Sequence, residues 1–302
     1  MAPEKNGMRG TCVALGNFDG IHLGHAHIIS TCVAAAKEKG LLSLVWSFRR
    51  HPEHIMKGNF STGNIISNSD KDEILRRMGV DLLFLEDFER VRHLSPEEFC
   101  EKILLGTLSA KALFCGFNFR FGKGGAGDAR FLKKYMEERG VSVYVAPPVC
   151  VGGEPVSSTR IRALLTLGDM EGVKGLLGRN YSIRFPVLHG KRLGSRIGFP
   201  TLNQVFPEEY VTPKIGVYAV KVHVDGRAWR GVCNVGIRPT VEEDGCLLAE
   251  THICDFSGDL YGRLVTVEFL RYLREERKFE DLDELCRQID RDRKEALALS
   301  EE

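Results

Sequence analysis

The sequence predicts an α/β domain followed by a domain of antiparallel strands. In the first part of the chain, short apolar runs alternate with stretches of helical periodicity, which is typical of a parallel sheet with helices on both faces. Beyond residue 217, apolar and polar residues alternate without intervening helices, which indicates an antiparallel barrel or sandwich. A chain of 302 residues is also long for one core. We therefore expect two domains, residues 1–180 and 181–302, with the boundary near 178–184.

The composition is that of an ordinary soluble globular protein, with 43% hydrophobic and 27% charged residues. The net charge of +1 provides no basic field to attract nucleic acid or a membrane surface. Nine cysteines without a Cys-x-x-Cys pair indicate reduced thiols and a cytoplasmic protein. The N-terminal residues are polar and no apolar run approaches ~18 residues, so we expect neither a signal peptide nor a membrane span.

The first domain is expected to contain five parallel strands separated by helices. A continuous apolar run such as 41–48 suits a strand that is buried on both faces. Ser95, Pro96 and Glu98 form a helix-start pattern with a capping box and a proline in the first turn. The stretch 57–69 is rich in polar residues and glycine and is expected to be a mobile loop. The expected strands are 11–15, 41–48, 81–85, 111–115 and 142–146, and the expected helices follow residue 25 and then cover 70–78, 95–106, 128–139 and 169–177.

Residues 16–25, Gly-Asn-Phe-Asp-Gly-Ile-His-Leu-Gly-His, lie at the first strand-to-helix junction. The glycines allow close backbone approach, and the start of a helix offers free N–H groups to a phosphate. His22 and His25 should lie on one side of the helix start and donate to phosphate oxygens. A chance occurrence and a zinc pair are the alternatives. The stretch is therefore interpreted as a cradle for a triphosphate.

Two further loops should converge on this cradle, because ligands of parallel sheets bind at the carboxyl ends of the strands. Residues 116–125 combine three aromatic rings with Arg120 and Lys123, which suits a planar phosphorylated ligand. The alternative is a surface turn whose phenylalanines fill the core. Residues 157–162 place three hydroxyl side chains and two arginines at a helix start, which favours anion binding, with simple helix capping as the alternative.

The second domain is expected to consist of a strand meander and a final helix. Asp225-Gly226 is a hairpin signal between two alternating segments. The helix places Leu282, Leu285, Ile289 and Ala296 on one face, so it should pack on this domain. The expected strands are 217–224, 228–235, 246–256 and 264–270, and the expected helix is 281–297.

The second domain also carries a candidate phosphate site. A glycine-bounded basic loop, 190–194, precedes Thr201 and Asn203, and together they offer backbone amides, cations and side-chain oxygens. These are the groups that hold a nucleotide phosphate with Mg²⁺. Glu250 lies in the middle of an expected strand between small residues, where it is either a solvated residue or a catalytic base.

With these segments identified, the chain resembles the prokaryotic bifunctional riboflavin kinase and FAD synthetase family from about residue 11 to residue 290. The resemblance implies an N-terminal, Rossmann-like FMN adenylyltransferase of the nucleotidyltransferase superfamily and a C-terminal riboflavin kinase built as a small β-barrel. The matching segments are Gly16–His25, His51-Pro52, Gly116–Gly122, Ser157–Arg162, Gly178-Arg179, Gly198–Asn203, Leu260–Gly262 and Leu273–Phe279.

In the first half, the resemblance implies that His22 and His25 bind ATP and stabilise the charge that develops as FMN attacks the α-phosphorus. The side chain of Asn118 and its aromatic neighbours would hold the flavin. The implied ATP-binding residues are Gly16, Asn17, Phe18, Asp19, Gly24, Ser158, Thr159 and Arg162, and the implied flavin-binding residues are Asn118, Phe119 and Phe121.

In the second half, Glu250 matches the general base of the family, which would take the proton of the riboflavin 5′-hydroxyl. Thr201 and Asn203 would position Mg²⁺, and Arg274 falls in the segment associated with the flavin. The implied ATP-binding residues of this half are Gly190, Lys191, Gly194, Thr201 and Asn203.

The leading hypothesis is an enzyme that makes FMN from riboflavin and then FAD from FMN, using ATP and Mg²⁺ in both steps. One alternative is a kinase whose first domain is a weak or inactive adenylyltransferase, since Arg49-Arg50 departs from the usual family pattern. Another is a non-catalytic flavin-sensing module. The expected partners are the small molecules riboflavin, FMN and ATP, without nucleic acid or membrane, and the expected state is a monomer or weak homo-oligomer.

Overall fold

The computed structural model describes residues 10–60, 62–189, 198–238 and 246–299. It divides into two compact units, Met1–Ser158 and Thr159–Glu302, each of which is described by itself below. The boundary between the compact units lies before residue 180, the expected domain boundary. The reason is that the helical segment after residue 158 packs with the strands that follow it. Residue 180 as the point where the two activities divide stays a prediction.

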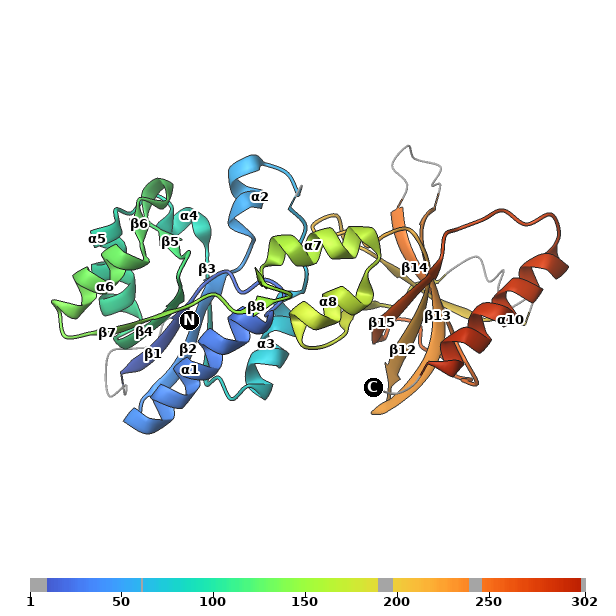
Figure 1. Ribbon diagram of the computed structural model, residues 1–302, viewed down its shortest axis with the longest axis horizontal. Coiled ribbons are helices and arrows are strands. Elements are labelled where there is room, and N and C mark those ends of the chain that lie inside the picture. Colours follow the sequence, from blue (N-terminus) through green and yellow to red (C-terminus); the bar gives the residue numbers. More distant parts are fainter. Residues whose placement is uncertain (1–9, 61, 190–197, 239–245, 300–302) are drawn as a thin grey trace. The chain divides into compact units, whose positions relative to one another are not determined.

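The first unit is built on a five-stranded parallel sheet with the order β3-β2-β1-β4-β7 (Figure 1). The central strand, β1, pairs in parallel with β2 on one side and with β4 on the other. All five predicted strands are present, so the predicted α/β class is confirmed. The strands are β1 Thr11–Leu15, β2 Leu42–Phe48, β3 Leu82–Glu86, β4 Ala110–Gly116 and β7 Ser142–Ala146.

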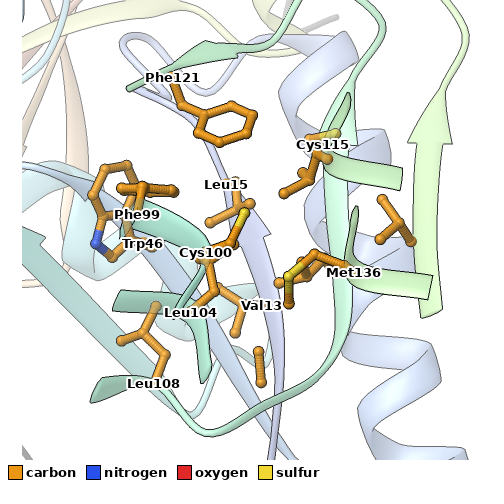
Figure 2. Packing of buried hydrophobic residues seen from close by; sticks show 14 of the residues in the cluster. Val13, Leu15, Trp46, Phe99, Cys100, Leu104, Leu108, Cys115, Phe121 and Met136 are labelled. Atoms are coloured by element: carbon orange, nitrogen blue, oxygen red, sulfur yellow. The ribbon is translucent and has the colours of Figure 1, made fainter. Parts of the chain in front are cut away.

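Both faces of this sheet are covered, as the continuous apolar strands predict. The Cys12 side of β1 faces α1, since the thiol of Cys32 donates to the Cys12 carbonyl oxygen at 3.2 Å. On the opposite face, Val13 and Leu15 belong to a core cluster with Phe99 and Met136 (Figure 2). Burial of such side chains stabilises the unit by about 1.5–3 kcal/mol each relative to exposure.

The predicted helices of the first unit are present, although the short segments Phe88–Val91 and Lys123–Gly125 were not predicted as helices and two further differences occur. Ser95 and Glu98 form the expected capping box, but the helix then continues as a π-helix through Gly106 to Thr107. The region 52–57, which falls partly in the expected loop, is a short helix that begins at Pro52 and is capped by His51. The helical segments are α1 Leu23–Lys39, α2 Pro52–Lys57, α3 Asn68–Arg77, α4 Phe88–Val91, α5 Pro96–Glu98, η1 Phe99–Thr107, η2 Lys123–Gly125 and α6 Ala129–Glu137. Two small hairpins pair β5 Arg120–Phe121 with β6 Gly127–Asp128 and β8 Cys150–Val151 with β9 Glu154–Pro155.

The second unit is built on a six-stranded antiparallel sheet with the order β10-β15-β12-β13-β14-β11. Its two edge strands approach each other, because Leu188 pairs with Asn203 and the amide of Gln204 donates to the Phe185 carbonyl at 2.7 Å. This closure agrees with the predicted barrel. The strands are β10 Tyr181–Pro186, β11 Thr201–Val205, β12 Gly216–Val224, β13 Arg227–Arg238, β14 Cys246–Ile253 and β15 Leu264–Arg274. Asp225 and Gly226 both have positive φ, as the predicted two-residue hairpin turn requires.

The described residues after 157 also form three helices: α7 Ser158–Leu167, α8 Met170–Leu177 and α10 Leu282–Ala298. The predicted packing of the last helix is confirmed, since Ala296 is fully buried with Val217 and Val232 of the sheet. Leu282, however, is 57% exposed, so the apolar face contacts the sheet only over its later turns. None of the described helices has the length and apolarity needed to cross a membrane.

Candidate active sites

The two predicted histidines form one compact pair at the start of α1. His22 is the N-cap residue, and its Nδ1 accepts the backbone N–H of His25 at 3.2 Å. The two imidazole rings stack with centroids 3.5 Å apart. A Cβ placed on Gly24 would lie 3.2 Å from Cε1 of His22, so the glycine leaves the space that this folded-back ring needs. The predicted placement on one side of the helix start is therefore correct.

The hydrogen bond of His22 decides where its proton lies. Because Nδ1 accepts, the neutral imidazole carries its proton on Nε2, which is then a donor. Burial, followed by the nearby His22 and Lys71, lowers the pKa of His25 well below its usual value. Nδ1 of His25 is buried and has no hydrogen-bond partner within the described residues. His25 is therefore neutral at neutral pH, and N–H donation by the two histidines to a phosphate stays a prediction.

The loop between β1 and α1 is held in an unusual backbone conformation. Phe18, Gly20 and Ile21 have φ values of 48°, 83° and 39°, which is the region that non-glycine residues rarely occupy. The ring of Phe18 is 1% exposed and leaves no room for a side chain on Gly16, whose Cβ would meet it at 3.0 Å. The strain at these positions is supported by buried contacts, as is common at functional sites.

Asp19 has a structural partner that the sequence did not indicate. Its buried carboxylate accepts the backbone N–H groups of Ile65 and Ile66, at 3.0 and 3.4 Å for the same oxygen. It therefore ties the loop after β1 to the segment before α3. Its predicted contact with ATP stays a prediction.

Lys71 of α3 is a residue of this site that sequence reasoning missed. It is 4% exposed, and its ammonium donates to the Asn17 carbonyl at 2.9 Å and to the Ser47 hydroxyl at 3.2 Å. The available signal was its position four residues before Leu75, on the buried side of the helix. A charged residue on the buried side of a helix is rare unless it has a partner, so this position indicates a buried cation.

The aromatic loop after β4 divides into a buried part and an exposed part. Phe121 is 6% exposed and belongs to the core cluster, with Phe119 stacked on it at 5.5 Å between ring centroids. The proposed alternative, that phenylalanines of this loop fill the core, thus describes Phe121. Asn118 is exposed, and its Oδ1 lies 3.1 Å from the Cβ position of Gly116, beside Ile28 of α1. Flavin binding by these three residues stays a prediction.

The loop before α7 makes one described contact with the first strand end. The hydroxyl of Ser158 donates to the Asp19 carbonyl at 2.8 Å, so it anchors the chain there. Thr159 and Arg162 belong to the second unit, and their predicted contact with ATP stays a prediction. Gly190, Lys191 and Gly194 lie outside the described residues.

In the second unit, the sheet brings the predicted kinase residues together. Asn203 on β11 is the register partner of Glu250 on β14, and Thr201 is the register partner of His252. Register partners lie about 4.5–5.5 Å apart and point to the same face of a sheet. The neighbours of Glu250 in the chain, Ala249 and Thr251, are fully buried on the other face. The three predicted residues therefore form one patch of oxygen atoms on the same face of the sheet, in which Asn203 is buried and Thr201 and Glu250 are half-buried.

A second missed residue extends this patch. Asn234 on β13 is the register partner of Glu250 on the other side, and its amide donates to the Glu276 carboxylate at 2.7 Å. A Cβ on Gly236 would lie 2.3 Å from that carboxylate oxygen, so Glu276 lies against the bare backbone there. The segment after β15 is thereby fixed at the edge of the patch.

Arg274 has a protein partner in addition to its predicted flavin contact. Its guanidinium binds the Asp292 carboxylate of α10, with Nε at 3.0 Å from Oδ1 and Nη2 at 2.7 Å from Oδ2. Nη1 donates to the Glu275 carbonyl at 3.0 Å. Asp292 is buried, with 4% of its side chain exposed, and also accepts from Gln288. The guanidinium group of Arg274 thus joins α10 to the end of β15.

Comparisons with known proteins agree on both units. The pattern of the FAD synthetase family matches residues 4–160, and the pattern of the riboflavin kinase family matches residues 177–300. The fold and these matches define a two-domain transferase with one nucleotidyltransferase domain and one kinase domain.

Curated relatives extend the match over nearly the whole chain. Proteins named bifunctional riboflavin kinase/FMN adenylyltransferase are 38% identical in Pseudomonas fluorescens, covering 99% of this chain and 95% of theirs, and 35% identical in Bacillus subtilis strain 168, covering 94% and 91%. The chain belongs to the family of bifunctional riboflavin kinase/FMN adenylyltransferases, which confirms the resemblance. A crystal structure titled macrolide-efflux protein, from Streptococcus pneumoniae, shares the fold with a TM-score of 0.88 and 30% identity, covering 99% of this chain and 98% of that one.

Proposed function

We propose that this chain makes FMN and FAD in two separate sites. The kinase half transfers the γ-phosphoryl group of ATP to the riboflavin 5′-hydroxyl and releases ADP. The adenylyltransferase half joins FMN to the adenylyl group of a second ATP and releases pyrophosphate. The observation that carries the kinase assignment is the pairing of Asn203 with Glu250, which places oxygen ligands beside a carboxylate that can accept a proton.

In the kinase half, Glu250 accepts the proton of the attacking hydroxyl, and phosphoryl transfer then depends on positioning and charge stabilisation. Thr201 and Asn203 fit Mg²⁺, because this hard cation prefers neutral and anionic oxygen ligands and they lie two residues apart on one face of β11. When bound, Mg²⁺ would neutralise charge on the ATP phosphates. Within the described residues there is no cluster of three acidic, His or Cys side chains that would suit a metal instead. Arg274 would support the flavin side from its position on Asp292.

In the adenylyltransferase half, His22 and His25 donate to the ATP phosphates as the FMN phosphate attacks the α-phosphorus. Donors fixed before the reaction stabilise the developing charge without a covalent intermediate. Backbone groups of the loop from Gly16 to Gly24 would surround the same phosphates, and Ser158, which is bonded to the Asp19 carbonyl, would be a further ligand. Asn118 and Phe119 would hold the isoalloxazine ring, and Phe121 would support Phe119 from the core.

A paired experiment tests both sites. Flavins are separated by chromatography after incubation with ATP and Mg²⁺, starting either from riboflavin or from FMN. Glu250→Gln should stop FMN formation and leave FAD formation from added FMN, whereas the double variant His22→Ala/His25→Ala should show the reverse. Loss of both products in either variant, with the fold intact, would contradict two independent sites. Wild-type protein that makes FMN without FAD would support the kinase-only alternative.

The cellular setting of the protein is part of the same proposal. All nine cysteines are free thiols, which supports a cytoplasmic location. We expect a monomer or weak homo-oligomer without nucleic acid, and light scattering coupled to gel filtration measures the mass directly.

A further inference from the structure

Lys71 is a buried cation at the adenylyltransferase site that the mechanism above does not use. Its ammonium donates to the Asn17 carbonyl at 2.9 Å and to Ser47 Oγ at 3.2 Å. The Ser47 hydroxyl donates to the same carbonyl at 2.8 Å. One peptide oxygen of the loop after β1 therefore accepts two hydrogen bonds, both from below the loop in β2 and α3.

Placing a lysine here is costly for stability. Burial lowers the pKa of Lys71 to about 8, and the Asp19 carboxylate only partly opposes this effect. A methionine or leucine would fill the same space without that penalty, since removing an ammonium from water is expensive. Packing alone therefore does not explain the residue.

The groups around Lys71 show what its charge acts on. Asp19 faces it from the loop, Ser47 from β2, and His25 from α1, where the charge of Lys71 helps to keep the imidazole neutral. On its own helix, Asp70 is bound to the Ser67 hydroxyl at 2.6 Å, and Asp72 pairs with Arg76 in solvent. The positive charge of Lys71 therefore lies close to the strained loop and to the histidine pair.

The geometry of the peptide between Asn17 and Phe18 determines what the charge of Lys71 does. The peptide between Asn17 and Phe18 is trans, so its C=O and N–H groups point in opposite directions. Since the carbonyl points down to Lys71, the N–H of Phe18 points away from the ammonium. The conformation that allows this includes the positive φ of Phe18, which needs support from its surroundings.

We propose that Lys71 is a positioning residue for FMN adenylylation, which turns the Asn17 carbonyl inward so that the Phe18 amide faces the ATP phosphates beside His22 and His25. The inference rests on the proposed role of residues 16–25. A protonated lysine forms charge-assisted hydrogen bonds, which are about twice as strong as neutral ones. Deprotonation therefore loosens the loop, and adenylylation should decline above pH 8, where the lysine loses its proton.

The test compares Lys71→Met with Lys71→Arg and with a control, Leu75→Met, which lies one turn further on the same buried side. The kcat and KM for FMN adenylylation are measured from pH 6.5 to pH 9.5, and riboflavin phosphorylation by the same samples reports on the second unit. Lys71→Met should lower kcat at pH 7 by at least about 10-fold, because misplaced groups at an active site lower the rate by about this factor or more. It should also remove the alkaline decline. Lys71→Arg should recover part of kcat and move the decline to higher pH, and Leu75→Met should match wild type.

The proposal is overturned if Lys71→Met keeps kcat within about two-fold, or if its alkaline decline stays at the wild-type pH. If Lys71→Met does not fold, Ser47→Ala is measured in its place. This variant removes one acceptor of the Lys71 ammonium, so the alkaline decline in adenylylation should shift to lower pH. An unshifted pH profile would equally refute the role. His22→Ala/His25→Ala is measured alongside. If that variant retains full adenylylation, the proposed site itself is wrong, which is a different failure from that of Lys71.

Discussion

Asn203 on β11 lies directly opposite Glu250 on β14. The two residues are far apart in the sequence, and only the antiparallel register of the closed sheet makes them neighbours. On the other side of Glu250, the same register adds Asn234, whose amide holds Glu276. A row of polar side chains thus crosses three strands, while the residues between them in each strand fill the core.

The first prediction concerns the oxygen ligand in this row. Asn203→Leu should abolish most riboflavin phosphorylation, because it removes the amide oxygen proposed to bind Mg²⁺ and the polar neighbour of Glu250 on β11. Asn203→Asp should retain activity with a changed Mg²⁺ requirement. Both are measured as initial rates of FMN formation against Mg²⁺ concentration. Val205→Thr, two residues further along β11, serves as the control and should behave as wild type.

Gly24 is predicted to be essential for a steric reason. In Gly24→Ala, the new Cβ would lie 3.2 Å from the His22 ring, so the ring should move and lose its bond to the His25 amide. FAD formation from FMN should fall by about 10-fold or more, as for a displaced catalytic donor. The control is Gly175→Ala in α8, where a Cβ meets nothing within 4 Å. That change should leave both activities intact and stabilise the helix by about 0.5–1 kcal/mol. Equal losses in the two variants would contradict the steric argument.

Asp292→Ala should destabilise the second unit, because it leaves the Arg274 guanidinium without its buried carboxylate. The expected loss in the free energy of unfolding is about 3 kcal/mol. The chain has two tryptophans, Trp46 in the first unit and Trp229 in the second, so Trp46→Phe protein reports on the second unit alone by fluorescence in urea. The double variant Arg274→Leu/Asp292→Leu should recover much of the loss. If it is no more stable than Asp292→Ala, the pair is not the source of the effect.

The cysteines should differ sharply in reactivity. Burial raises the pKa of Cys32, Cys115 and Cys233 to about 12, so these thiols are protonated at pH 8 and react slowly. Cys150 and Cys246 are exposed and Cys286 is half-buried. In native protein at pH 8, DTNB should label the two exposed thiols first, and then Cys286. Mass mapping of the labelled peptides checks the order, and early labelling of Cys233 would show that the barrel opens.

The predicted strands and helices rest on local information, and most of them are correct. Alternation predicts β12, β13, β14 and β15 of the barrel but not β10 and β11. The pattern Ser95-Pro96-x-Glu98 predicts a helix start that the structure shows as a capping box. The π-helical continuation was not predictable, because Gly106 is a typical helix end and the continuation depends on core packing of Phe99 and Leu104. The short helix after His51 was missed because its turn falls next to a stretch of loop-like composition.

The sequence by itself determined the two fold classes, the histidine pair and the candidate kinase residues, because hydrophobic period and short motifs are local properties. Only the tertiary structure decided which of these residues meet. In the folded protein, Asn203 lies opposite Glu250, and the Arg274 guanidinium binds the Asp292 carboxylate. Phe121 lies in the core, and the Lys71 ammonium donates to the Asn17 carbonyl. Strand register and burial depend on contacts between segments remote in the chain, and those contacts leave no periodic signal in the sequence.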